Sequence, residues 1–266
     1  LGVQPNVRLL WTPDAAQSAW ISVARAIRTP SRMEQDRNVY RFPIPSFDVA
    51  MAPPTIIETV TGPLQDEEVD ALDVGWRGQL GAKASLDIAG FYYHYDDLRG
   101  GQLGPPAMIP PGYLIIPTQT DNSLNAHSYG AEVSLDWCVL PSWRLQANYS
   151  WLHMRVRGRD EPTQAPSEVG DVSPTQQFSL RSALDLPHEL RWDAWLRAVS
   201  RIPVFDIPGY VTLDMRLAWN ATRRLELSLV GQNLLDAAHP EFGSLYLETL
   251  PTEIERSAYA RIDWKF

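Results

Sequence analysis

The residues that could do chemistry in this sequence are scattered, and they form no recognisable catalytic arrangement. His94 lies just before Asp96 and Asp97, and such a group could hold a metal ion, but the same residues also fit a strand end that enters a loop, which we favour. No serine stands with a histidine in a nucleophile setting. The five histidines lie in different segments, without metal-ligand spacing: His94, His127, His153, His188 and His239. The sequence therefore predicts no catalytic site, no resident metal and no cofactor.

Acidic residues also gather in two other places. One group within a single loop could bind calcium through oxygen ligands, but its spacing fits solvated surface charge better: Asp160, Glu161, Glu168 and Asp171. The segment 236–241 is interpreted as the end of a strand rather than as an acid–base pair. The single cysteine, Cys138, excludes a disulfide framework and a thiolate zinc site, and we expect it to be an unreactive residue near a turn.

Composition excludes several classes of protein. The 266 residues carry 32 acidic against 23 basic side chains, a net charge of −9, which argues against a nucleic-acid partner. Ten Trp, ten Tyr and seven Phe exclude intrinsic disorder. Apolar runs are only a few residues long, so no transmembrane helix is expected.

The elements that must position these residues are β-strands, because apolar and polar residues alternate in segment after segment. In Val211–Trp219 the odd positions are apolar and the even ones mostly polar, and the tail from Ala258 to Phe266 repeats the pattern. This period indicates strands with one wet and one apolar face. No helical period of useful length is present, so the chain is all-β. Eleven strands are expected: 3–12, 18–27, 67–80, 83–95, 127–138, 143–156, 175–186, 189–200, 209–219, 223–233 and 256–266.

The connections between these strands alternate between short and long. Tight turns are expected at Thr12–Gln17, Gly81–Ala82, Val139–Ser142, Pro187–His188 and Asn220–Thr222, and long loops between them. Strict alternation places all the tight turns at one end of the sheet and all the large loops at the other. This is typical of an outer-membrane barrel with short periplasmic turns and long extracellular loops.

The apolar face could contact either lipid or another protein layer, as in a soluble sandwich or propeller. Over ten of the strands the apolar phase carries no charge, whereas roughly half of the opposite phase is charged, as a lipid face requires. Tryptophans near the tight turns would form an interfacial girdle: Trp11, Trp20, Trp137, Trp143, Trp219 and Trp264. We therefore favour a transmembrane antiparallel up-and-down β-barrel. Since bacterial barrels have an even number of strands, eleven suggests that further strands precede Leu1.

Several stretches resemble the C-terminal half of a TonB-dependent outer-membrane receptor, in order and at suitable spacing. They are Trp20–Ser31, Glu68–Arg77, Phe91–Leu98, Ser128–Val133, Gly231–Asp236 and Tyr259–Phe266. The resemblance implies that residues 1–266 are the C-terminal part of a 22-stranded barrel domain, with about 11 strands and without the plug domain. It also implies that Trp264 and the terminal Phe266 belong to the signal read by the barrel-assembly machinery.

The resemblance further implies a location in the outer membrane of a Gram-negative bacterium and a function in active uptake. The ligand would be a ferric siderophore, haem or cobalamin, the partners would be the TonB–ExbB–ExbD system and membrane lipid, and no enzyme activity is implied. A passive porin or an autotransporter translocator is the alternative, and a soluble β-sheet binding protein is a third. Aromatic and cationic residues of the long loops are the expected ligand contacts: Arg37, Tyr40, Arg41, Phe42, Tyr113, Phe242 and Tyr246.

Overall fold

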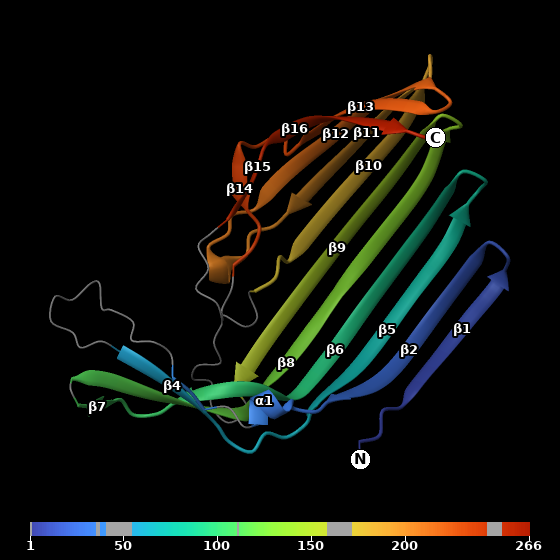
Figure 1. Cartoon of the computed structure of the whole chain (residues 1–266). Coiled ribbons are helices and arrows are strands. Elements are labelled where there is room, and N and C mark those ends of the chain that lie inside the picture. The colour runs from blue at the N-terminus through green and yellow to red at the C-terminus, as the bar shows by residue number, and fades with distance from the viewer. Residues whose placement is uncertain (1, 36–37, 41–54, 111, 159–171, 244–251) are drawn as a thin grey trace.

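The computed structural model describes residues 2–35, 38–40, 55–110, 112–158, 172–243 and 252–266, and its main feature is one long, curved antiparallel sheet (Figure 1). All eleven strands expected from the sequence are present in it. Their bounds are β1 Asn6–Asp14, β2 Gln17–Arg28, β5 Glu67–Leu80, β6 Ala84–Leu103, β8 Tyr113–Leu140, β9 Trp143–Gly158, β10 Gln176–Leu186, β11 Leu190–Val199, β12 Tyr210–Thr222, β13 Leu225–Gln232 and β16 Ser257–Trp264.

These strands form a meander in which each pairs with the next along the chain. The order is β1-β2-β5-β6-β8-β9-β10-β11-β12-β13-β16, and every neighbouring pair is antiparallel. The tight turns lie together at one end of the sheet and the long connections at the other, with β1 starting at the loop end and the C-terminus at the turn end (Figure 1). The predicted alternation of short and long connections is confirmed. In the described part of the chain, β1 and β16 are the two edges of this path.

One face of the sheet is apolar and uncovered. The register sets Trp192, Leu217, Leu229 and Ala260 side by side across β11, β12, β13 and β16. Their row faces outward, and large apolar side chains of the same phase are widely exposed, including Leu229 at 60% and Ile262 at 70%. A soluble sandwich would bury this face against a second layer. Among the described residues, the buried apolar set is instead confined to Leu124, Ala126, Ile202, Ile207 and Ala218.

Most of the predicted tryptophan girdle lies on this outward face. Trp11, Trp137, Trp219 and Trp264 are between 41% and 64% exposed and lie near the turns. The prediction for Trp20 is wrong. Its cross-strand partners are Leu10 and Gly75, in the opposite phase to Trp11, so its ring lies on the polar face. A Cβ built on Gly75 would lie 2.1 Å from the Trp20 ring, so glycine makes room for the indole.

Two expected strands are longer than their alternation indicated. The strand expected at 83–95 extends to Leu103, and the one expected at 127–138 begins at Tyr113. Their pairing shifts at a bulge between Tyr95 and Leu98, where Asp97 adopts a φ of 57°. The bulge changes the phase, so the period breaks while the ladder continues. His94 therefore precedes a bulge within a strand, and the interpretation of its segment as a strand end is wrong.

The long connections carry small elements of their own. The first holds the helix α1 (Arg32–Gln35) and the strands β3 (Asn38–Tyr40) and β4 (Thr55–Thr61); β4 pairs in parallel with the extension of β8. β7 (Ala107–Ile109) pairs with β8, and β14 (Ala238–Pro240) with β15 (Glu253–Glu255). A single 3-10 turn, η1, spans Pro203–Phe205. Within the described ranges, no helix is long and apolar enough to cross a membrane.

Candidate functional site

The polar face of the sheet is organised by ion pairs between neighbouring strands. Arg216 on β12 bridges Asp193 on β11, at 3.1 Å, and Glu226 on β13. Further pairs of this kind join Arg77 to Asp87, Arg144 to Asp136 and Arg197 to Asp214. The mixed-sign charges that the sequence places on this face therefore satisfy one another across the strands. Such a surface can line a water-filled space without leaving isolated charges.

The indole of Trp195 lies on this polar face, on β11. The Trp195 ring contacts two guanidinium groups, that of Arg181 at 4.1 Å and that of Arg197 at 4.4 Å from its centroid. Its Nε1–H is buried and has no acceptor among the described residues. Trp195 also lines shallow hollows on either side, shared with Gln146 and Asp214. Aromatic and cationic groups together suit an anionic or aromatic group that enters the space above the face.

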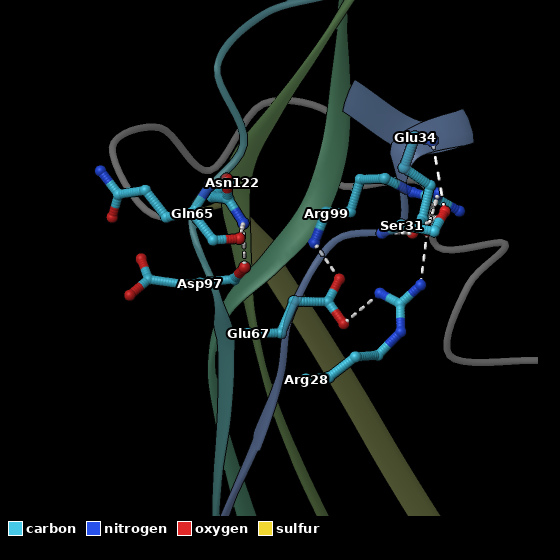
Figure 2. A network of polar contacts seen from close by, with 8 residues as sticks. All are labelled: Arg28, Ser31, Glu34, Gln65, Glu67, Asp97, Arg99 and Asn122. Atoms are coloured by element: carbon cyan, nitrogen blue, oxygen red, sulfur yellow. Dashed lines mark hydrogen bonds and ion pairs between the residues drawn. The ribbon is translucent and has the colours of Figure 1, made fainter. Parts of the chain in front are cut away.

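At the loop end, a second network ties the first long connection to the sheet (Figure 2). One carboxylate oxygen of Glu34 accepts hydrogen bonds from Arg28 and Arg99, both at 2.5 Å. Glu67 accepts from the same two residues, from the Arg28 guanidinium at 2.7 Å and from the Arg99 backbone N–H at 2.9 Å. This network ties α1 to β2, β5 and β6, which fixes the start of the loop.

Hydrogen bonds at the N-terminus of α1 also fix the Glu34 side chain in place. Its second carboxylate oxygen accepts hydrogen bonds from the Ser31 backbone N–H at 2.8 Å and the Ser31 hydroxyl at 2.9 Å. The Ser31 hydroxyl in turn accepts from the Glu34 N–H, which completes a capping box. These bonds, with the Ser31 backbone first and Arg28 next, lower the pKa of Glu34 to about 2. Sequence reasoning missed this site, although the spacing Ser31-x-x-Glu34 signals it.

Next to the Glu34 network, Asn122 forms hydrogen bonds that stabilise the bulge of β6. Its side-chain amide donates to the backbone carbonyls of Asp97 at 2.5 Å and Gln65 at 3.2 Å, and its Oδ1 accepts from the Gln65 N–H at 2.7 Å. Figure 2 shows these three residues next to the Glu34 network. The bulge is therefore bonded to the chain that enters β5, which fixes its geometry.

A third anchor lies where β13 ends. Asn233, 2% exposed and with a φ of 50°, donates its backbone N–H to Asp214 and its side-chain amide to the Ile254 carbonyl, both at 2.9 Å. His239 stacks on Tyr210 with centroids 4.3 Å apart and bonds Glu241 at 3.0 Å. Through His239, the segment 236–241 packs the last long connection onto β12. β13 ends earlier, at Gln232, and the segment contains the separate strand β14, so its interpretation as a strand end is wrong.

The expected ligand contacts are only partly within the described residues. Tyr113 opens β8 opposite Ile109, Tyr40 ends β3, and Phe242, 69% exposed, follows β14. Tyr40 and Tyr113 belong to the connected group β3, β4, β7 and β8, whereas Phe242 follows β14, which pairs with β15 in a separate sheet. Arg37, Arg41, Phe42 and Tyr246 lie outside the described residues.

The structure describes only some of the residues that were considered as metal ligands. Where the structure describes the chain, no three His, Cys, Asp or Glu side chains are placed to hold a metal ion. The ring of His94 stacks on that of His127, with centroids 4.5 Å apart. The Nε2 atom of His94 lies 3.1 Å from the Asp96 carboxylate. The acidic group Asp160, Glu161, Glu168 and Asp171 lies outside the described residues. Cys138 is a free, exposed thiol beside a tight turn.

Comparison with known proteins identifies the sheet. Residues 2–234 match the family described as TonB dependent receptor-like, beta-barrel. The chain belongs to this family. TonB-dependent receptor barrels lie in the outer membrane of Gram-negative bacteria and are transport receptors rather than enzymes. The uncovered apolar face of the sheet is therefore the lipid-facing side of a barrel wall, and the ion-paired face lines the lumen.

Several solved structures have the same fold as this chain. The chain is similar to FpvAI in its complex with pyocin S2 (TM-score 0.68, 16% identity, 99% of this chain and 33% of that one). It is also similar to the siderophore receptor PirA from Acinetobacter baumannii (0.68, 13%, 99% and 41%) and the copper transporter OprC (0.65, 19%, 98% and 40%). The chain thus spans between a third and two fifths of these structures. No curated protein sequence matches it.

Proposed function

We propose that residues 1–266 form the C-terminal part of the barrel of an outer-membrane receptor that imports a scarce ligand by TonB-driven transport. The family match over residues 2–234 carries this proposal, supported by the lipid-facing apolar side and the ion-paired lumen side. Its energy would come from the TonB–ExbB–ExbD system, acting through the plug domain of the complete receptor. The barrel-assembly machinery would insert the protein, reading the end of β16 with Trp264 and Phe266.

The ligand class we propose is an iron chelate, a ferric siderophore above all, with haem and cobalamin in the same group. Two of the similar structures are described as the siderophore receptor PirA and as the ferric yersiniabactin uptake receptor FyuA from Yersinia pestis. Contacts to the chelate would come from loop residues with aromatic or cationic side chains, of which Tyr113 and Phe242 are described. The Arg181–Trp195–Arg197 group would meet the same ligand deeper in the lumen, because guanidinium and indole suit anionic, aromatic chelates.

Growth under metal limitation tests the proposal. The complete gene would be deleted in its own host, and the strain would be fed single ferric chelates, haem, cobalamin or copper as the limiting nutrient. We expect loss of growth on one iron source, restored by the complete gene but not in a strain without TonB. Loss of growth on copper alone would move the ligand class to copper, for which the likeness to OprC gives a reason. Uptake that continues without TonB would contradict active transport and favour a passive porin.

A variant pair then tests the loop contacts. Phe242→Ser removes an exposed aromatic side chain, whereas Met108→Ser removes an exposed apolar side chain, 60% exposed, beside the β7–β8 extension. If Phe242 contacts the chelate, only the first variant weakens its binding to whole cells. Equal affinities for both variants and the wild type would remove Phe242 from the site.

A further inference from the structure

Two histidines face each other across β6 and β8, in the same outward phase as Tyr92, which is 45% exposed. The register pairs His94 directly with His127, and their Nδ1 atoms lie 3.1 Å apart. The hydroxyl oxygen of Tyr92 lies 2.8 Å from the same Nδ1 atom of His127. Three polar atoms therefore converge at one point on the outer side of the wall. Spacing along the chain does not reveal the pair, because its two histidines are 33 residues apart.

Hydrogen bonds alone do not satisfy these three atoms. A neutral imidazole nitrogen either donates one proton or offers one lone pair. His127 Nδ1 nevertheless has two neighbours at hydrogen-bond distance, the Nδ1 atom of His94 and the hydroxyl of Tyr92. In either tautomer of His127, only one of the two contacts is a full hydrogen bond, and the other brings two polar atoms together without one. A metal ion would satisfy all three atoms, because each can offer it a lone pair.

The separations of these atoms match those between the ligands of one metal ion. Zinc binds imidazole nitrogen at about 2.0–2.1 Å, so two ligands of a square-planar or tetrahedral ion lie roughly 2.8–3.4 Å apart. Both measured separations, 2.8 Å and 3.1 Å, fall within this range. The two imidazole rings are inclined by 25°, so one ring has to turn about its χ2 bond before both lone pairs point at the ion. The His94 side chain is 34% exposed, which leaves space for this turn and for water ligands.

Asp96 orients the imidazole of His94. Its carboxylate lies 3.1 Å from Nε2, the other ring nitrogen of that histidine. A histidine that binds a metal usually donates its second N–H to a carboxylate or a similar acceptor, which fixes the tautomer and raises the basicity of the ligand nitrogen. With the proton on Nε2, the lone pair of His94 is on Nδ1, next to His127. Asp96 and His94 thus have the arrangement of a carboxylate–histidine–metal triad.

The site lies where the outer side of the wall changes from apolar to polar. The last outward row with mostly apolar or aromatic side chains is Val23, Leu72, Tyr92, Tyr129 and His153. The next outward row, two residues nearer the loop end, is Arg25, Asp70, His94, His127 and Arg155. On β8 the outward phase from Trp137 to Tyr129 spans nine residues, and a tilted strand needs about 9–11 residues to cross the hydrocarbon core. This reversal therefore places the two histidines at the aqueous boundary, where an ion from outside the cell can reach them.

We propose that His94, His127 and Tyr92 bind a divalent transition-metal ion, Cu²⁺ or Zn²⁺, on the outer side of the barrel wall. Imidazole suits copper and zinc, whereas Ca²⁺ and Mg²⁺ take oxygen ligands. The two imidazoles are the main ligands, the phenol oxygen is the third, and water completes the coordination. The site differs from a cluster of three histidine, cysteine or acidic ligands, since one of its ligands is a phenol. It faces away from the lumen, so it is separate from the transported ligand and goes beyond the proposed function.

Metal binding to the complete receptor, purified in detergent micelles, tests this site. Cu²⁺ or Zn²⁺ alone would be added, and bound metal would be counted after equilibrium dialysis, for the wild type and three variants: His94→Ala, His127→Ala and Asp96→Ala. The electron paramagnetic resonance spectrum of bound Cu²⁺ would show whether imidazole nitrogens are its ligands. The matched control is His153→Ala, which removes an exposed histidine from the neighbouring strand β9. Heat-modifiable migration on gels would confirm folding, and glutamine would replace histidine in any alanine variant that does not fold.

We expect the wild type to bind one more equivalent of Cu²⁺ than His94→Ala or His127→Ala, with hyperfine splitting from two imidazole nitrogens in that equivalent. Asp96→Ala should weaken its binding about 10–100-fold. Zn²⁺ should bind more weakly than Cu²⁺. His153→Ala should bind like the wild type. Equal stoichiometry and affinity in the wild type and both histidine variants would overturn the proposal, and so would a nitrogen signal that is lost in His153→Ala but kept in His127→Ala.

Discussion

The guanidinium carbon of Arg181 lies 4.1 Å from the centroid of the Trp195 ring, its direct cross-strand partner on the lumen face. The guanidinium carbon of Arg197 lies 4.4 Å from the centroid of the same ring, so one indole forms cation–π contacts with two arginines. Trp195 is an apolar residue in the polar phase of β11, between Asp193 and Arg197. The contact gives the reason, because the electron-rich face of the ring offsets two like charges that share a small area.

Replacing Trp195 therefore tests this contact. Each cation–π contact contributes about 0.5–1 kcal/mol at a partly exposed site, so Trp195→Ala should lower the free energy of unfolding by about 1–2 kcal/mol. Trp195→Phe keeps an aromatic face and should retain about half of that energy. Urea unfolding of the complete protein in micelles measures both. Equal stability of Trp195→Ala and the wild type would show that the ring does not stabilise the two arginines.

The Glu34 network predicts a pH dependence at the loop end. The pKa of Glu34 in the folded protein, about 2, lies below its ordinary value of 4.5. Its contribution to stability is therefore complete above about pH 4.5 and is lost as the pH falls through about 2. Glu34→Gln should cost about 1–3 kcal/mol at pH 7. The difference between variant and wild type should shrink between pH 4.5 and 2, and a constant difference over that range would contradict the network.

Adjacent residues on β13 test which face meets lipid. Leu229 faces outward and is 60% exposed, whereas Val230 faces the lumen beside Arg181 and Arg216. An arginine near the bilayer midplane costs about 2–4 kcal/mol, so Leu229→Arg should sharply reduce the folded protein in the outer membrane. Val230→Arg should be tolerated. Heat-modifiable migration of the two variants gives the comparison, and equal loss in both would contradict the assignment of the faces.

The terminal residue separates assembly from stability. Phe266 is fully exposed beyond the end of β16 and contributes little to the packing of the sheet. Deleting Phe266 should lower the amount of inserted protein several-fold while the inserted fraction unfolds at the wild-type urea concentration. Lys265→Ala is the control and should insert normally. Normal insertion after deletion of Phe266 would contradict its role as an assembly signal.

The strands could be predicted from the sequence because lipid on one side and a polar lumen on the other impose a strict period of two. The prediction failed where another interaction replaced that rule. Trp20 does not belong to the predicted girdle, because its ring lies on the lumen side. The ring fits there because Gly75 has no side chain. β6 continues beyond the segment with alternating polar and apolar residues, because the bulge at Asp97 shifts the phase of the alternation. Asn122 on the neighbouring strand stabilises that bulge by a hydrogen bond.

The loop end was harder to predict for a further reason. The parallel pairing of β4 with β8 joins residues more than fifty positions apart, and no local pattern signals such a contact. The capping box at Ser31 and Glu34 is local and could have been found, but the arginines that complete its network come from β2 and β6. The reversal above Tyr129 was also present in the sequence, and it becomes visible only once the register aligns five strands at one height.

Oxygen accessibility along β12 measures the central inference most directly, which is that the uncharged side of the sheet contacts hydrocarbon. Single nitroxide labels would replace Leu213, Asp214, Met215, Arg216 and Leu217 in turn, in a protein whose one cysteine has been changed by Cys138→Ser. Oxygen is concentrated in hydrocarbon, so its collision rate with the labels should peak at Leu213, Met215 and Leu217 and fall at Asp214 and Arg216. Peaks at Asp214 and Arg216, or no alternation, would contradict the account.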